Sequence, residues 1–533
     1  MASILITFVL SLVIAWALVP WFAKLAIGVG LVDNPDKNRK LHEKPIPMVG
    51  GIVVFFTIST IVAVAFYLVC LDIPILSRCD GKLATMLGYP ADYLALRRIR
   101  SNVLHQYSGL FIGSVILMFV GVLDDRFGVR GRQKLFGQFL ATTVLVIYGY
   151  RFDSLTFLGI DLELDVFSIL FIYGWVLASI NSVNLLDGAD GIAATIGIIM
   201  GFSLTIMLMA QGRVVDALVA IALAGSLLGF LRYNFPPASV YLGDAGSMLI
   251  GFLLAALAIR CTVKQNSIYA FAAPLALLAI PFIDTAAAIV RRRLTGRSIF
   301  AVDRGHLHHK LMKRGFGPKT SLVWVALLSG MSAAGGVLAL VLRQPEYAVL
   351  AIICVIIVMI VNQIFGIAET ELILKRAYGF SRRMMQTPGA DSRVKPLTTA
   401  VHVQGDLDWK SGWNELSNYA EQNQLHQLTF DINAPWLHEA FHAKLTSREK
   451  VREASHLWES LLPLISDGKV FGSVAFKCSQ DNPKCHREII AEILEIGTRL
   501  ESLIRDSKSE TTSPSGDDSP PNDAPGKVST LSN

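Results

Sequence analysis

The stretch Asn181-Ser-Val-Asn-Leu-Leu-Asp-Gly-Ala-Asp-Gly191 lies between two apolar runs, at about 165–183 and 191–210. A run of about 20 apolar residues can cross a lipid bilayer as a helix. Carboxylate and amide side chains at a membrane edge are costly unless they have a task there. The stretch therefore predicts two membrane helices joined by a functional polar segment. The plainer interpretation is a capped helix end with Asp-Gly turns.

Apolar runs of this kind fill most of the first 367 residues. Hydrophobic residues make up 53% of the 533 residues and charged residues 17%, whereas soluble domains carry about 25% charge. This composition predicts an all-α polytopic membrane protein with about eleven transmembrane helices, followed by a C-terminal soluble α+β domain. The first run lacks a basic leader, so we expect a retained helix. The expected spans are roughly 3–27, 50–70, 107–123, 135–150, 165–183, 191–210, 214–231, 246–260, 268–290, 321–342 and 347–367.

Four more polar clusters lie at the ends of expected spans, at 33–51, 123–134, 234–247 and 303–309. Counting the spans places all five clusters on one side of the membrane. The loops on that side also hold most of the Lys and Arg residues of the membrane part, which indicates the cytoplasmic face. We therefore expect the N-terminus outside and the C-terminus inside a bacterial plasma membrane.

The residue types in these clusters suit phosphate and metal chemistry. Asp124 and Asp125 are adjacent carboxylates that can hold a divalent cation or divide into base and structural roles. Lys134 follows them, and its ammonium group suits a phosphate ligand. Taken alone, this cluster is equally well explained as a solvated loop that sets topology.

The stretch 181–191 places oxygen-bearing side chains at every third position, which would form one stripe if the segment stayed helical. Asn and Asp oxygens suit Mg²⁺, which shares its ligands with substrate phosphates. Asp244 lies between glycines near an expected helix N-terminus, which favours anions. The positions on the stripe are Asn181, Asn184, Asp187 and Asp190.

The loop Asp303-Arg-Gly-His-Leu-His-His309 gathers three histidines beside basic residues. Histidine can bind metals, transfer protons or contact phosphate. The neighbouring Arg304 and Lys310 would repel a cation, so phosphate contact is the better interpretation. A basic loop that binds anionic lipid is the alternative.

The chain changes character after the last apolar run. Residues 368–395 form a basic connector, and 396–506 predict a small α+β domain with strands at 397–403, 427–433 and 470–476. Residues 507–533 are rich in Ser, Pro, Asp and Gly, which predicts a disordered tail. The domain shows no catalytic arrangement, so we expect a regulatory role or a cytoplasmic protein partner.

In their order, the five clusters resemble the polyprenyl-phosphate N-acetylhexosamine-1-phosphate transferase family over residues 1–367. The Asp-Asp pair, the stretch 181–191 and the loop 303–309 carry most of the resemblance. It implies transfer of a sugar 1-phosphate from a UDP-N-acetylhexosamine to a polyprenyl phosphate such as undecaprenyl phosphate, with no nucleic-acid partner. The histidine loop resembles the bacterial type that uses UDP-N-acetylglucosamine.

The resemblance also implies roles for single residues. The catalytic carboxylates would be Asp124, Asp125 and Asp187. The metal ligands would be Asn184 and Asp244, holding Mg²⁺, or Mn²⁺ in its place, with the substrate pyrophosphate. Asp190 would lie near the uracil. The remaining substrate-binding residues would be Lys44, Lys134, Arg304, His306, His308 and His309.

Three alternatives stay open from the sequence. The phospho-N-acetylmuramoyl-pentapeptide transferases have a related but different histidine loop. A polytopic transporter would place its ionisable residues near the bilayer midplane, whereas here they lie at span ends, with Asp284 as the main exception. A membrane-anchored scaffold would leave the five clusters without a role.

Overall fold

The computed structural model describes residues 2–34, 45–70, 93–152, 154–157, 160–163, 165–262, 268–294, 305–362, 397–404, 407–434, 439–446, 457–466, 469–479, 482, 484 and 486–512. The chain divides into two compact units, Met1–Tyr378 and Gly379–Asn533. Lys44, Arg304, the connector 368–395 and the part of the tail beyond Thr512 lie outside the described residues.

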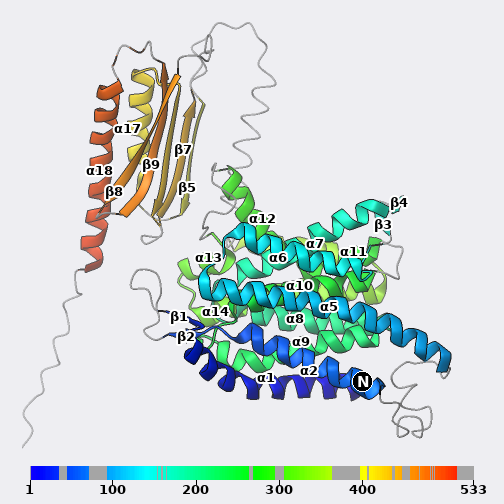
Figure 1. Cartoon of the computed structure of the whole chain (residues 1–533). Coiled ribbons are helices and arrows are strands. Elements are labelled where there is room, and N and C mark those ends of the chain that lie inside the picture. Colours follow the sequence, from blue (N-terminus) through cyan, green and yellow to red (C-terminus); the bar gives the residue numbers. More distant parts are fainter. Residues whose placement is uncertain are drawn as a thin grey trace, which may run out of the picture. The chain divides into compact units, whose positions relative to one another are not determined.

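The first unit is a helical bundle (Figure 1). Two short hairpins join its helices, β1 (Val32–Asp33) with β2 (Ile46–Pro47) and β3 (Ser154–Phe157) with β4 (Ile160–Glu163). Its helices are α1 (Ala2–Val29), α2 (Gly50–Cys70), α5 (Tyr93–Phe127), α6 (Gly131–Ile147), α7 (Asp165–Leu186), α8 (Ile192–Ala210), α9 (Val214–Asn234), α10 (Gly243–Thr262), α11 (Ile268–Leu277), α12 (Ala279–Leu294), α13 (Leu307–Lys313), α14 (Pro318–Leu342) and α15 (Glu346–Val361).

The bundle is that of an integral, multi-pass membrane protein. Seven helices of the described part are long and apolar enough to cross a bilayer, or eight if the pair Phe271–Leu277 and Ala279–Arg293, bent by 72°, counts as one span. The expected number of about eleven is therefore met only in part. The difference falls on α2, α6 and α15, whose described apolar lengths are shorter than the bilayer requires or are interrupted by polar residues.

Helix α10 forms the centre of the bundle, and 89% of its apolar window is buried (Figure 1). It packs against α5, α7 and α2, and apolar or small residues cover all of its sides. A helix that is apolar all round belongs in a core or a membrane. By contrast, only 17% of the window in α1 is buried, so this helix lies at the rim.

Small residues allow α1 and α9 to approach each other closely. Gly225 and Gly229 are one turn apart on α9 and face Ser11 and Ala15 of α1. A Cβ atom added at Gly229 would lie 2.3 Å from the carbonyl oxygen of Leu12. Glycines at this spacing are a common means of bringing membrane helices into van der Waals contact.

The second unit contains a five-stranded antiparallel sheet with the strand order β5-β7-β6-β9-β8. Its strands are β5 (Leu397–Gln404), β6 (Gln427–Ala434), β7 (Glu439–Thr446), β8 (Leu457–Ser466) and β9 (Lys469–Ser479). The helices α17 (Trp409–Gln422) and α18 (His486–Thr512) join its core through Trp409, Leu416, Ile489 and Ile493. An α+β region is thus confirmed.

Three of these strands match the sequence expectation, whereas β7 and β8 were not expected. Alternation is clear in β6, where Leu428, Phe430 and Ile432 are buried and their neighbours are not. Helix α18 continues to Thr512, beyond the expected start of the tail at residue 507.

The α1–α9 contact generates a stability prediction. In Gly229→Leu the new side chain would meet backbone atoms of Leu12 and Trp16, which cannot move aside without separating the helices. Overpacking of this kind costs about 1–3 kcal/mol. We expect a lower midpoint of thermal unfolding in detergent. Gly174→Leu in α7 is the matched control, because nothing lies within 4 Å of its Cβ position. Equal midpoints for the two variants would contradict the contact.

Candidate functional site

Lys134 is the meeting point of three of the polar clusters. Its Nζ atom lies 2.8 Å from Oδ2 of Asp124 and 2.8 Å from Oδ1 of Asp244, and it donates to Oδ1 of Asn184 at 3.3 Å. Helix α5 ends just after Asp124, and Gly128, with a positive φ of 67°, turns the chain into α6. The turn therefore brings the lysine back beside the carboxylate.

Solvent access differs among these side chains. The side chain of Asp124 is 9% exposed and that of Lys134 15%, whereas that of Asp244 is 38% exposed. Asp124 is also fixed by the backbone N–H of Val129, which donates to its Oδ1 atom at 2.8 Å. Asp244 is thus the member of the cluster most open to a ligand.

The neighbouring carboxylate, Asp125, has a different environment. Its Oδ1 atom accepts the backbone N–H of Asp244 at 2.7 Å, and its Oδ2 atom accepts that of Ala245 at 3.3 Å. These amides belong to the first turn of α10, where N–H groups have no partner within the helix. Gly243 has a positive φ of 77°, and a Cβ there would lie 2.6 Å from Asp125. Asp125 therefore positions Asp244.

Asn184 connects α7 with α10. Its Nδ2 atom donates to Oδ1 of Asp244 and, at 2.8 Å, to Oγ of Ser247. The expected stripe of four oxygen-bearing residues is wrong in one respect, because α7 ends at Leu186 and only its first two members are helical. Asn181 turns away and donates to Oε1 of Gln138 at 2.7 Å.

The segment between α7 and α8 holds the other two members of the stripe. Asp190 accepts the backbone N–H of Ala238 at 2.9 Å, and Asn234 accepts that of Gly191 at 3.0 Å. Asp187 is partly accessible, but its carboxyl group lies among protein atoms. Burial, with the nearby Asp244, Asp125 and Asp190, raises the pKa of Asp187 well above its ordinary value. A cation would favour the charged form.

The oxygen-rich cluster fits Mg²⁺ bound together with a substrate phosphate. Within the described part of the chain, no three acidic, histidine or cysteine side chains come close enough to enclose a metal ion. Mg²⁺ usually keeps several waters and takes only one or two carboxylates from the protein. Asp244 and the side-chain oxygen of Asn184 can supply such a partial set, with Asp187 near them.

The histidine loop is anchored by Asp284, a residue of α12. Nδ1 of His306 lies 2.7 Å from Oδ2 of Asp284, and the backbone N–H of Leu307 donates to Oδ1 at 2.9 Å. Asp284 is completely buried. The sequence offers one signal for it, an acidic residue inside an otherwise apolar run.

His308 lies against the segment between α7 and α8. A Cβ added at Gly188 would lie 2.8 Å from Nε2 of His308, so the imidazole occupies the space above the glycine. The residue is 1% exposed, and neither ring nitrogen has a hydrogen-bond partner among the described residues. Burial, reinforced by His309, lowers the pKa of His308 to about 3.

The first polar cluster, residues 33–51, contacts the site through Gly50 and Gly51. The amides of Gly50 and Gly51 donate to the carbonyl oxygens of Tyr241 and Leu242 at 3.0 and 2.9 Å. A Cβ at Gly51 would lie 2.3 Å from the backbone nitrogen of Gly246. This contact fixes the chain that leads into α10. Gln138, Ser247 and Asn234 support the site as well, and the sequence alone did not single them out for these roles.

The arrangement defines a polar site at the ends of membrane helices, with the residue types that phosphate transfer requires. The sequence profile of Glycosyl transferase family 4 matches residues 107–262. The chain is 31% identical over 349 residues to the decaprenyl-phosphate N-acetylglucosaminephosphotransferase of Mycobacterium tuberculosis, a match that covers 60% of this chain and 79% of the relative. The chain belongs to glycosyl transferase family 4, and the resemblance seen in the motifs is confirmed.

Two further relatives carry related names. The probable undecaprenyl-phosphate N-acetylglucosaminyl 1-phosphate transferase of Bacillus subtilis is 28% identical over 330 residues, covering 62% of this chain and 82% of the relative. The undecaprenyl-phosphate alpha-N-acetylglucosaminyl 1-phosphate transferase of Yersinia pestis is 30% identical over 337 residues, covering 62% and 82%. Each match leaves more than a third of this chain without a counterpart.

The buried His308 predicts a loss of stability in mild acid. An unfolded histidine takes up a proton below about pH 6.5, whereas the folded protein resists protonation until about pH 3. The contribution of this group to stability is therefore complete above pH 6.5 and is lost as the pH falls toward 3. At pH 5 the loss amounts to about 2 kcal/mol.

Thermal unfolding in detergent between pH 7.5 and 5 checks this expectation. The wild-type midpoint should fall more steeply than that of His308→Gln, which does not titrate in this range. Parallel curves for the two proteins would show that His308 is not buried as a neutral group.

Proposed function

We propose that this protein transfers N-acetylglucosamine 1-phosphate, or a related N-acetylhexosamine 1-phosphate, from its UDP-sugar to undecaprenyl phosphate. UMP is released, and the product begins the membrane stage of cell-envelope polysaccharide synthesis. The observation that carries the proposal is the convergence of Asp124, Asn184 and Asp244 on Lys134. The names of the relatives, which specify polyprenyl phosphates and N-acetylglucosamine, support the same substrates.

In this reaction an oxygen of the acceptor phosphate attacks the phosphorus that bears the sugar. A new phosphorus–oxygen bond forms, the bond to the bridging oxygen breaks, and that oxygen leaves with UMP. Asp124, which faces Lys134 whereas Asp125 faces the amides of α10, would position the acceptor phosphate and take its proton. Lys134 would stabilise charge on the transferred group.

Asn184 and Asp244 would hold Mg²⁺ with the pyrophosphate, and Asp187 would support them. The metal would offset the negative charge that collects on the leaving group. Asp190 would lie near the uracil. The phosphate contacts would come from Lys44, Arg304, His306, His308 and His309.

The proposed topology completes this assignment. We expect α2, α6 and α15 to cross the membrane too, giving about eleven spans, with the N-terminus outside and the site on the cytoplasmic face. The concentration of Lys and Arg in loops on the site's side supports this orientation.

A radiochemical assay tests the function and the orientation together. Labelled UDP-N-acetylglucosamine, undecaprenyl phosphate and Mg²⁺ are expected to yield UMP and a labelled lipid with purified protein and with inside-out vesicles, but not with sealed right-side-out vesicles. No product with the purified protein would refute the function. Product with UDP-N-acetylmuramoyl-pentapeptide alone would favour the peptidoglycan alternative.

Two substitutions test the site. Asp244→Asn and Lys134→Gln should each lower turnover by about 10²–10³, the usual effect of removing a group that stabilises transition-state charge. Glu346→Gln, at an exposed position of α15, is the charge-matched control and should keep wild-type turnover. Activity within tenfold of wild type in Asp244→Asn would remove this residue from the site.

Truncation tests whether the first unit holds the complete site. All described residues of the site lie within Met1–Tyr378. A chain that ends at Arg383 is therefore expected to insert into membranes and to transfer sugar phosphate at a rate within about threefold of wild type. A tenfold change in rate would correspond to a change of about 1.4 kcal/mol in the activation free energy. A truncated protein that unfolds as cooperatively as wild type but has no activity would show that the second unit completes the site.

A further inference from the structure

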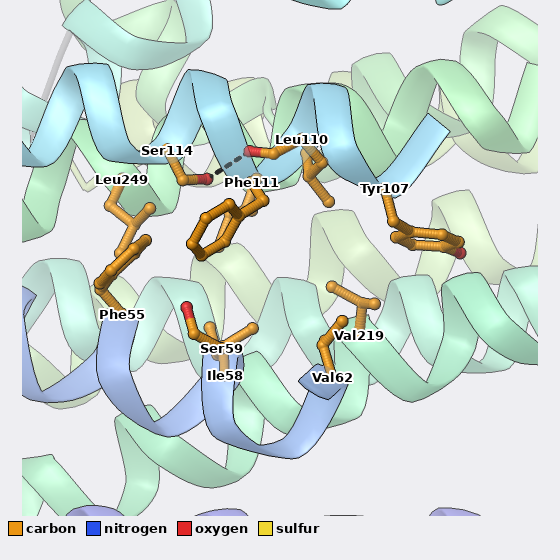
Figure 2. A pocket seen from close by; sticks show the side chains of 11 residues that line it. Phe55, Ile58, Ser59, Val62, Tyr107, Leu110, Phe111, Ser114, Val219 and Leu249 are labelled. Carbon is orange, nitrogen blue, oxygen red and sulfur yellow. Dashed lines mark hydrogen bonds between the residues drawn. The ribbon is translucent and has the colours of Figure 1, made fainter. Parts of the chain in front are cut away.

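An apolar groove runs between α2 and α5 on the bundle (Figure 2). Phe55 and Val62 line it from α2, Tyr107 and Phe111 from α5, and Leu253 of α10 and Val219 of α9 complete it. The groove is partly open to the surroundings, and its lining is mostly apolar. Ser114, the serine on the α5 side, donates its hydroxyl to the carbonyl oxygen of Leu110 at 2.7 Å. The groove therefore suits a hydrocarbon chain.

The groove is closed toward the catalytic cluster. At that level α2 and α5 both touch the first turns of α10, through Gly51 against Gly246 and Gly121 against Ala245. Farther along the helices, the rings of Phe55 and Phe111 stack at a centroid distance of 5.8 Å and separate α2 from α5. The groove thus lies along the helices between the catalytic cluster and the other end of the bundle.

A buried ionic cluster lies at that other end. Asp216, which is 3% exposed, accepts the hydroxyl of Tyr107 at 2.5 Å and Nε of Arg260 at 3.0 Å. Arg260 also donates to Gln106 and lies over the ring of Tyr150. Tyr107 belongs to both the groove and the cluster, and Leu253 is two helical turns from Arg260 on one face of α10. The groove therefore leads to the cluster.

The cluster carries an excess of positive charge. Within the described part of the chain, two guanidinium groups, Arg213 and Arg260, face the single carboxylate of Asp216. Arg260 contacts both carboxylate oxygens, whereas Arg213 reaches one of them at 3.4 Å only. The side chain of Arg213 is 10% exposed, and its Nε atom is buried without a hydrogen-bond partner. The accessible part of the Arg213 side chain is therefore where a ligand can bind, and the excess of positive charge favours an anion there.

We propose that the groove and the Arg213 side of the cluster bind one anionic phospholipid of the leaflet opposite the catalytic cluster. One acyl chain lies between α2 and α5, and the phosphate group accepts hydrogen bonds from Arg213. The dimensions agree. The distance along α10 from Leu249, at the inner end of the groove, to Arg260 is about 16 Å. This is close to half of the hydrocarbon thickness of a bilayer, which is about 30 Å.

Native mass spectrometry of delipidated, full-length protein tests this site with two probes, dioleoyl phosphatidylglycerol and dioleoyl phosphatidylcholine. The wild type should retain one phosphatidylglycerol in preference to phosphatidylcholine. In Arg213→Gln this preference should fall by about fivefold, as expected for one arginine at a membrane surface. Arg343→Gln removes an exposed arginine at the same end of the bundle and should keep the wild-type preference.

A groove-filling substitution tests the chain separately. Ser59 points into the groove (Figure 2), so Ser59→Phe should weaken the retention of both lipids. Thr60→Phe places the same ring at the exposed neighbouring position of α2 and should have no effect. The proposal would be overturned if Arg213→Gln and Ser59→Phe both retained lipid like the wild type. It would also be overturned if the controls Arg343→Gln and Thr60→Phe lost as much lipid as the test variants. The ionic cluster would then have a structural role only.

Discussion

Two backbone amides at the start of α10 donate to the carboxylate of Asp125, and the arrangement of the candidate site follows from this contact. The amides carry the partial positive charge of a helix N-terminus, so a buried carboxylate is stabilised there. The contact fixes the first turn of α10 against the end of α5. Asp244 then lies within reach of Lys134 from α6 and Asn184 from α7.

Negative charge is in excess around this turn. Asp124 and Asp244 pair with the ammonium group of Lys134, and the carboxylates of Asp125 and Asp187 lie near Asp244. The amides of α10 compensate Asp125, whereas burial and the neighbouring carboxylates raise the pKa of Asp187. A divalent cation shared with a pyrophosphate would complete the balance. At its other end, α10 meets the opposite situation, where two arginines of the described part of the chain face the carboxylate of Asp216.

Much of the fold follows from local properties of the sequence. The long apolar runs became helices because each backbone group in a bilayer must find its partner within its own segment. The run 268–290 bends by 72° between Leu277 and Ala279, next to Pro281, which has no N–H to continue the helix; the sequence showed this proline but not the size of the bend. Nor did it show β8, because Pro463 and Glu459 obscure the alternation of an edge strand.

The sequence by itself determined which residues were candidates, since residue type and position at a span end are local facts. Only the tertiary structure decided their roles. Adjacent residues of a helix point about 100° apart, so Asp124 faces Lys134 while Asp125 faces α10, and no property of the pair predicts which is which. The pairing of Asp216 with Arg260 has the same origin. The two residues meet because the start of α9 and the end of α10 come together in the bundle, and contacts between distant residues are made only when the helices pack.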